Sequence, residues 1–392
     1  MVEQVRSRAD SVVKLGPIAS CQEPLNVTTL RERMEGGKES MAIDPDKLDA
    51  FVGRAVNDLG AAVSGLLLHI GDKLGLYKTM ADTGPLTSQQ LADKTGTAER
   101  YIREWLANQA AGGYVSYDAA SNTYSLTEEQ AFCLANEESP AFLPGGFESL
   151  AACFVDEPKI TAAFRSGLGV GWHEHDTRLF SGTCRFFRPS YNANLVTSWI
   201  PALDGVEATL KRGAKVADLG CGHGSSTVVM AKAFPKSKFI GFDYHGPSIQ
   251  QARKAAEQAG VADRVLFETA GAKDFPGVDY DLVTFFDCLH DMGDPVGAAR
   301  HVRRALRPDG TVMLVEPFAG DTLAENLNPV GRVYYGFSTV VCTPASLSQE
   351  VGLALGAQAG EQRLRKVMTD GGFTRFRRAT QTPFNLVLEV RP

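Results

Sequence analysis

The chain has 392 residues, of which 44% are hydrophobic and 22% charged, and its net charge is −6. This length is too great for one compact core and suits two domains with a tail. No block rich in lysine or arginine occurs, which argues against nucleic acid or an anionic membrane as a partner.

The seven cysteines are scattered and never form a CxxC pair, which indicates free thiols in a reducing compartment. No apolar run approaches the ~20 residues of a membrane span. The first residues also lack the apolar core of a signal peptide, so we expect a cytoplasmic protein. Residues 1–42 are mixed in charge without periodicity and are predicted to be a disordered extension.

A helical pattern begins at Pro45 and predicts one long helix with a single apolar stripe. The stripe comprises Leu48, Phe51, Val52, Ala55, Val56, Leu59, Val63, Leu66, Leu67 and Ile70. Because it is long for a helix on a small domain, we expect a partner subunit to cover part of it. The predicted assembly is a homodimer formed through this N-terminal helical domain.

Residues 72–126 have the pattern of a helix-turn-helix followed by a β wing, within a domain expected to span 43–130. Thr87 is predicted to cap the helix SQQLADKTG, and Thr97 to cap the helix AERYIREWLANQAAGG. The second helix is expected to bury Tyr101, Ile102, Trp105, Leu106 and Ala110. The strand-like pieces YVSYD and TYSL would form the wing.

A winged helix raises the possibility of DNA binding through its second helix. Residues 44–145, however, contain 7 Lys/Arg and 14 Asp/Glu, a net charge of −7. Phosphate neutralisation supplies most DNA affinity, so this charge favours a dimerisation and lid module. Residues 131–212 follow as an aromatic-rich helical connector that could close over a pocket. From 213 onward, short apolar strands alternate with amphipathic helices, as in an open α/β sheet.

The stretch KVADLGCGHGSSTVVMAKAFPKSKFIGFDYH carries the chemistry. A strand ends at Leu219 and enters the turn of Gly220, Gly222 and Gly224, whose spacing is GxGxG rather than the pyrophosphate-binding GxGxxG. Asp218 precedes the turn, where a negative charge suits a ligand bearing an ammonium and a sulfonium. A second strand ends in Asp243, whose carboxylate can bind both hydroxyls of a ribose.

The run from about 213 to 390, with its DLGCGHG and LRPDG motifs, resembles the class I S-adenosylmethionine-dependent methyltransferases. The front end resembles that of the small-molecule O-methyltransferases. The whole arrangement is similar to a group of winged-helix methyltransferases from mycobacteria and other actinobacteria. The resemblance implies a Rossmann-like seven-stranded sheet with a terminal antiparallel hairpin, S-adenosylmethionine as cofactor and a small-molecule acceptor.

The resemblance also implies roles for individual residues. The three glycines would shape the floor under the methionine part of the cofactor, and Asp243 would hold the ribose, with Tyr244 near the adenine. Ala272 and Lys273 occupy a place where many members carry an aspartate, so only a backbone contact is expected there. Asp287 would lie near the methionine ammonium or the substrate.

Methyl transfer to a hydroxyl needs a base, and His290 in LHDMGD is the best candidate. The resemblance implies that Glu316, at the end of the fifth strand, helps to orient it. For both residues a purely structural role stays open. Met292 stands where the O-methyltransferases usually carry a tryptophan. The cluster GWHEHD lacks complementary ligands, so no metal is expected.

Weaker substrate-binding candidates lie on the connector, in the insert after the fifth strand and on the first helix: His69, Trp172, Tyr191, Asn326, Arg332 and Tyr335. Two other functions remain open. One is a transcriptional regulator that senses S-adenosylmethionine, which would need a basic recognition face. The other is an enzyme that keeps the fold and cofactor without transferring a methyl group.

Overall fold

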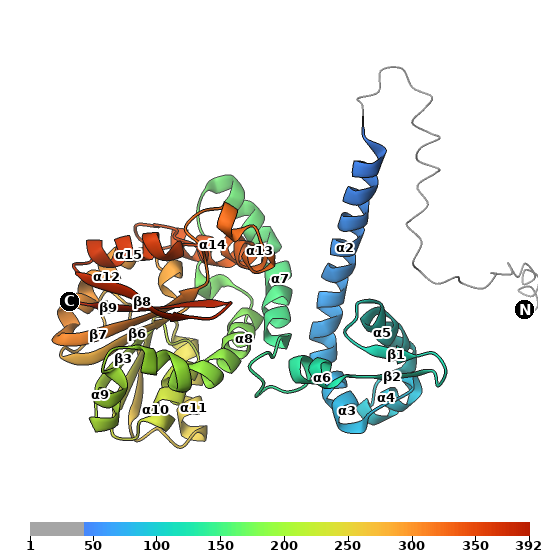
Figure 1. The fold of residues 1–392 in the computed structure, drawn as a ribbon, viewed down its shortest axis with the longest axis horizontal. Coiled ribbons are helices and arrows are strands. Elements are labelled where there is room, and N and C mark those ends of the chain that lie inside the picture. The colour runs from blue at the N-terminus through green and yellow to red at the C-terminus, as the bar shows by residue number, and fades with distance from the viewer. Residues whose placement is uncertain (1–42) are drawn as a thin grey trace, which may run out of the picture. The chain divides into compact units, whose positions relative to one another are not determined.

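A computed structural model describes residues 43–392 (Figure 1). The predicted extension at residues 1–42 lies outside the described residues. The chain divides into two units, residues 1–63 and 64–392, and each is described by itself.

The described part of the first unit belongs to the helix α2 (Pro45–Lys73), as predicted. Its stripe is exposed at Phe51 (63%) and Leu59 (67%). By length and composition alone α2 is apolar enough to cross a membrane, and one such helix is weak evidence for a span. The structure therefore leaves an uncovered apolar face on this helix.

The predicted winged helix is present in the second unit. Its elements are α3 (Leu76–Thr83), α4 (Ser88–Thr95), α5 (Glu99–Ala111), β1 (Ser116–Asp118), β2 (Thr123–Ser125) and α6 (Glu128–Leu134). Thr87 caps α4 through the reciprocal capping box with Gln90. Leu86 forms an isolated antiparallel bridge with Tyr124 of β2, so the segment before α4 pairs with the wing.

Two details of α5 differ from the sequence prediction. Its N-cap is Ala98, and the hydroxyl of Thr97 instead lies 2.8 Å from that of Thr95. Tyr101 is 81% exposed, because the buried face follows helical steps through Ile102, Trp105, Leu106 and Gln109.

The connector is helical, as predicted. It comprises α7 (Pro144–Ser166), η1 (Trp172–Glu174), α8 (Arg178–Asn194), the π-helical turn η2 (Leu195–Trp199), η3 (Ile200–Ala202) and α9 (Val206–Arg212).

The seven-stranded sheet has the order β5-β4-β3-β6-β7-β9-β8. Its first five strands are parallel, whereas β9 runs antiparallel to both β7 and β8. The strands are β3 (Lys215–Leu219), β4 (Lys238–Asp243), β5 (Val265–Thr269), β6 (Tyr280–Phe286), β7 (Leu306–Pro317), β8 (Arg375–Gln381) and β9 (Asn385–Arg391). The predicted fold class is confirmed.

Helices cover both faces of the sheet (Figure 1). Val216 packs in the core that contains residues of α10 (Ser225–Ala233) and α11 (Gly246–Gln258), whereas Ala217 packs in the core that contains α12 (Pro295–Ala305) and α15 (Gly360–Asp370). This alternation is the two-residue period of a strand buried on both faces.

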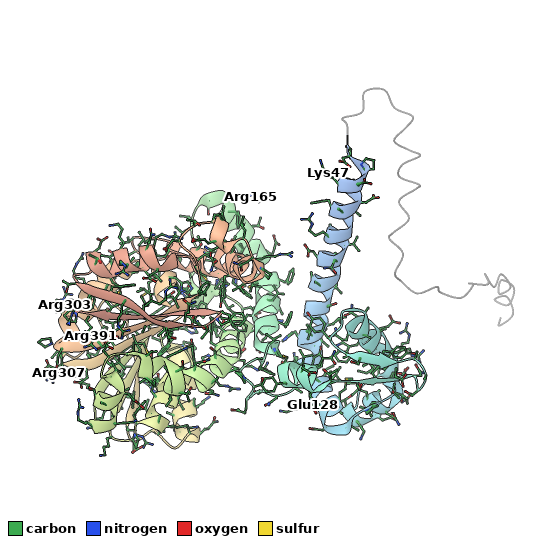
Figure 2. The ribbon with its side chains drawn as sticks, viewed as in Figure 1. Lys47, Glu128, Arg165, Arg303, Arg307 and Arg391 are labelled. Atoms are coloured by element: carbon green, nitrogen blue, oxygen red, sulfur yellow. The ribbon has the colours of Figure 1, made fainter. Side chains whose placement is uncertain are left out.

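The remaining elements follow β6 and β7: η4 (Leu289–Asp291), η5 (Ala324–Asn326), α13 (Pro329–Phe337), the π-helical turn η6 (Ser338–Cys342) and α14 (Thr343–Leu347). One end of the sheet, where β7 begins, is marked by Arg303, Arg307 and Arg391 (Figure 2). The opposite end, where the parallel strands finish, is the ligand-binding edge of open α/β sheets.

Candidate active site

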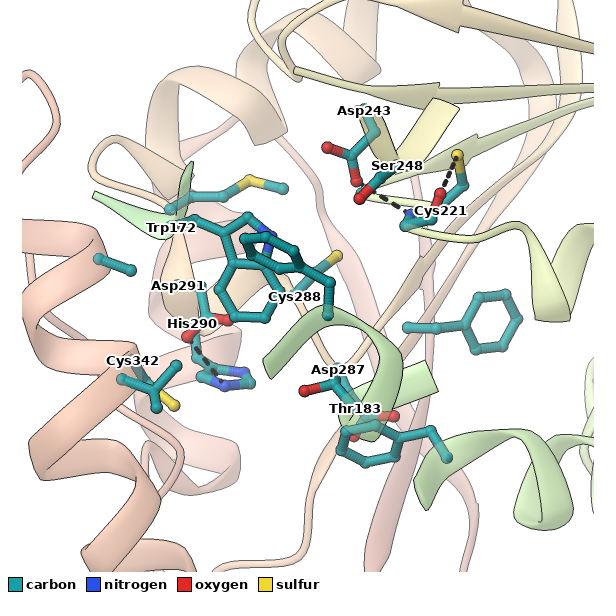
Figure 3. Close-up of a pocket in the computed structure, with 18 of the residues that line it drawn as sticks. Trp172, Thr183, Cys221, Asp243, Ser248, Asp287, Cys288, His290, Asp291 and Cys342 are labelled. Atoms are coloured by element: carbon teal, nitrogen blue, oxygen red, sulfur yellow. Dashed lines mark hydrogen bonds and ion pairs between the residues drawn. The ribbon is translucent and has the colours of Figure 1, made fainter. Parts of the chain in front are cut away.

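A cavity of about 410 Å³ lies at the carboxyl ends of β3, β4 and β6 (Figure 3). Ten of the residues predicted for the site line it: Trp172, Tyr191, Gly220, Gly222, Asp243, Tyr244, Ala272, Lys273, Asp287 and His290. These residues come from four strand ends and from the connector, so the fold gathers segments that are distant in sequence.

The glycine turn forms one wall of the cavity. Gly220 and Gly222 have φ values of 67° and 53°, in the left-handed region that favours glycine. A Cβ on Gly220 would lie 2.7 Å from the sulfur of Cys288, whereas a Cβ on Gly222 would meet no atom within 4 Å. The turn thus packs tightly on one side and leaves open space beside Gly222.

Asp243 ends β4 beside this turn. Its Oδ2 accepts a hydrogen bond from the Gly222 N–H (2.9 Å), and its Oδ1 accepts one from the His245 N–H (2.8 Å). Burial raises the pKa of Asp243, while the two backbone hydrogen bonds favour the carboxylate. Each oxygen keeps a lone pair for a further donor.

Asp287 directly follows β6 and adopts a φ of 51°, which is unusual for a residue other than glycine. Its Oδ2 accepts a hydrogen bond from the Tyr191 hydroxyl (2.9 Å), and its Oδ1 accepts one from the Asn385 amide (2.9 Å). Burial, followed by the neighbouring Glu316 carboxylate, raises the pKa of Asp287 to about 8. A cationic ligand group would favour its ionised form.

His290 lies between two carboxylates. Its Nδ1 pairs with Oε2 of Glu316, whose Oε1 accepts a hydrogen bond from the Leu289 N–H (2.9 Å). Its Nε2 lies 3.2 Å from Oδ1 of Asp291. Burial disfavours the charged ring, but Asp291 and Glu316 outweigh it, and the pKa of His290 is raised well above its usual value.

Two family models match the chain. Residues 61–136 match an Rv2258c-like winged HTH domain, and residues 210–372 match a methyltransferase domain. The chain therefore carries a winged HTH domain of the Rv2258c-like type followed by a methyltransferase domain.

Individual relatives agree with this assignment. A 27-O-demethylrifamycin SV methyltransferase of Amycolatopsis mediterranei (strain S699) is 33% identical over 131 residues, which are 31% of this chain and 48% of that protein. The chain spans 35–58% of the length of the first curated relatives that it matches, or about half.

Solved structures share the fold over most of the chain. The mitomycin 7-O-methyltransferase MmcR has a TM-score of 0.65 at 20% identity, covering 88% of this chain and 100% of its own. Human N-acetylserotonin methyltransferase, solved in complex with SAM, has a TM-score of 0.63 at 16% identity, covering 90% and 99%.

Several residues predicted for the methyltransferase site do not line the cavity. Asp218 is buried behind the glycine turn, where the hydroxyls of Ser226, Thr227 and Thr284 donate to its carboxylate at 2.6–2.8 Å. A carboxylate engaged in this way holds β3, α10 and β6 together. Asp218 therefore does not line the cavity in which the other predicted cofactor residues meet.

Gly224 and Glu316 also do not line the cavity. A Cβ on Gly224 would lie 2.6 Å from the Phe267 ring, so this glycine is required for packing. Glu316 is buried and touches the site through His290.

Four of the substrate candidates are also absent from the lining. His69 is buried on α2 with an unpartnered Nδ1, and Asn326 hydrogen-bonds both backbone groups of Gly320. Arg332 is exposed on α13, and Tyr335 follows the residue that does face the cavity, Tyr334. A substrate contact of these four residues stays a prediction.

Several lining residues were not predicted from the sequence: Phe180, Thr183, Phe187, Asp291, Tyr334, Phe337 and Cys342. Asp291 could have been found, since it adjoins His290. The apolar residues of α8 offered only a helical stripe, which is more often core than pocket.

Proposed function

We propose that the chain is a cytoplasmic enzyme that transfers a methyl group from S-adenosylmethionine to a hydroxyl oxygen of a small molecule, with His290 as general base. One observation carries the proposal. A single cavity contains the glycine turn, the Asp243 carboxylate and His290, whose Nδ1 is paired with Glu316.

The residues of the cavity fit the proposed cofactor. The open space beside Gly222 gives a ligand close access to the backbone, and Asp243 offers free lone pairs to two ribose hydroxyls. Asp287 would face the methionine ammonium, and Tyr244, Ala272 and Lys273 would border the adenine. S-adenosylmethionine, when bound, supplies a methyl group on a sulfonium, which can pass to an acceptor oxygen with S-adenosylhomocysteine as the leaving group.

The protein's own part is to hold the acceptor and remove its proton. Glu316 would fix the His290 tautomer with its proton on Nδ1, leaving Nε2 to accept the hydroxyl proton. The imidazolium formed would be stabilised by Glu316 and Asp291, while Tyr191 orients Asp287.

Aromatic and aliphatic side chains form much of the remaining lining, including Trp172, Phe180, Phe187 and Phe337. Such a surface favours a moderately apolar acceptor, because burial of apolar area is the main favourable term available. Trp172 and Tyr191 belong to the connector 131–212, which we propose acts as the lid over the domain 213–392.

We further propose a homodimer through the domain 43–130. The support is the exposed stripe on α2, where Phe51, Leu59 and Leu66 (52% exposed) lie uncovered. DNA binding is disfavoured, because Arg100 and Arg103 of α5 are paired with Glu104 (2.6 Å) and Glu99 (2.7 Å).

The test is to incubate the purified chain with S-adenosylmethionine and a panel of apolar phenols and alcohols, and to measure S-adenosylhomocysteine. Release that depends on an acceptor supports the proposal. A folded protein that binds neither molecule in calorimetry would refute it. Binding without methyl transfer across the panel would favour the regulator or the non-methylating enzyme.

A further inference from the structure

Three side chains with metal-ligating atoms converge on one wall of the cavity. His290 and Asp291 come from η4, and Cys342 ends the π-helical turn η6 (Figure 3). Their ligating atoms all lie within 4.8 Å of one another, and all three residues line the cavity. A nitrogen, an oxygen and a sulfur donor thus meet at a surface that a small ligand can reach.

The pairing between His290 and Asp291 is incomplete. Oδ1 of Asp291 lies 3.2 Å from Nε2, yet it is buried and accepts no hydrogen bond. When the ring is neutral and keeps its proton on Nδ1 beside Glu316, Nε2 presents a lone pair close to this oxygen. Two such acceptors repel unless a positive charge lies between them; a proton on Nε2 supplies that charge in the ligand-free ring, and a bound metal ion that replaces this proton satisfies both acceptors.

The surroundings resemble those of built metal sites. Glu316 pairs with Nδ1 of His290, which is the carboxylate–histidine arrangement that orients a metal ligand from behind. Cys342 lies in a π-helical turn between α13 and α14, and such turns are frequent at functional sites. Neither feature depends on the donor cluster itself.

We propose that His290 Nε2, Asp291 Oδ1 and Cys342 Sγ bind a thiophilic divalent cation, Zn²⁺, with an open coordination position toward the cavity. Three protein ligands and one open position are typical of reactive zinc sites. Zinc–ligand bonds of ~2.0–2.3 Å require the ligating atoms to lie closer together than the 4.8 Å limit within which they are found. We expect rotation of the Cys342 side chain to bring its sulfur nearer to the other two atoms. On binding, the thiol and the protonated Nε2 each lose a proton to solvent.

This inference goes beyond the proposed methyl transfer and opposes the expectation that the chain holds no metal. Cys342 is remote in sequence from LHDMGD, so spacing could not reveal the cluster. The metal would occupy the nitrogen proposed as the base, so a zinc-loaded molecule could not use His290 for proton removal. Zinc binding is therefore tested by metal uptake and not by enzyme activity.

The test uses the full chain, freed of metal by a chelator and then titrated with Zn²⁺ in a calorimeter and with Co²⁺ in a spectrophotometer. We expect one Zn²⁺ per chain, proton release, and a thiolate-to-cobalt charge-transfer band. Cys342→Ser should abolish that band, and His290→Gln should weaken Zn²⁺ binding at least about tenfold. Glu316→Gln should weaken Zn²⁺ binding ~10–100-fold, because Glu316 orients the His290 ring that binds the metal.

Cys184→Ser is the matched control, because Cys184 is a cavity thiol outside the cluster and lies 3.2 Å from the Ser225 hydroxyl. This variant should keep both the charge-transfer band and the affinity. Wild-type protein that shows no stoichiometric Zn²⁺ uptake and no charge-transfer band overturns the proposal, even if a variant fails to fold. A band retained in Cys342→Ser also overturns it.

Discussion

Asp243→Ala tests the placement of the cofactor, because this carboxylate is the main polar group at the end of β4. It accepts hydrogen bonds from the Gly222 and His245 N–H groups, so its oxygens are already fixed relative to the glycine turn. A ribose would add two hydrogen bonds to a charged acceptor, each worth ~1.5–3 kcal/mol. Their loss, ~3–6 kcal/mol, corresponds to a Kd raised ~10²–10⁴-fold.

The assay is calorimetry of S-adenosylmethionine and of S-adenosylhomocysteine, with thermal melting to confirm that each variant is folded. Glu268→Ala is the matched control, because Glu268 lies opposite Phe242 on the neighbouring strand β5 and is exposed. Its Kd should equal that of the wild type. If folded Asp243→Ala binds within about threefold of the wild type, the ribose does not lie where we place it.

Four further outcomes are expected. His290→Ala should leave the cofactor Kd unchanged and lower turnover ~10²–10⁴-fold, and unchanged turnover would remove His290 from the role of base. Because the pKa of His290 is raised, its neutral form appears only as pH rises through that pKa. The rate should therefore increase with pH, and Asp291→Asn should shift the profile to lower pH; an unmoved profile would contradict this coupling. Leu66→Lys should convert a dimer to a monomer in sedimentation, and a dimer that persists would exclude α2 as its contact. Gly71→Ala would place a Cβ 2.5 Å from the Trp105 ring and should lower the free energy of unfolding by ~1–3 kcal/mol in a denaturant titration; a loss within error would show that the ring can move away.

Features set by local chemistry could be predicted from the sequence. The turn at Gly220 and the acid that ends β4 were identified because backbone conformation and strand ends leave a short, contiguous pattern. The capping of α4 by Thr87 is equally local and was confirmed. Thr97 failed as a cap because the chain enters α5 one residue later, at Ala98.

Features set by tertiary contact could not be predicted. Asp218 has the residue type of a ligand-binding acid, but three hydroxyls from α10 and β6 engage it. In the insert after β7 the helical phase decides which tyrosine faces inward, and Tyr334 lines the cavity while Tyr335 does not. Cys342 reaches His290 only because η6 returns to the end of β6, a path that no local pattern encodes.

The protonation of His290 connects the two proposals for this site. Asp291 and Glu316 favour the imidazolium, so in the ligand-free cavity the ring holds the proton that a general base must lack. A cation in the cavity opposes this preference, because like charges disfavour each other in a poorly solvated space. A sulfonium near the Asp287 end would lower the pKa of the ring and prepare the base, whereas Zn²⁺ on Nε2 would replace the proton outright. Asp291 and Glu316 thus make His290 a poor base in the ligand-free cavity. They also make the protonation state of His290 depend on which cation occupies the cavity.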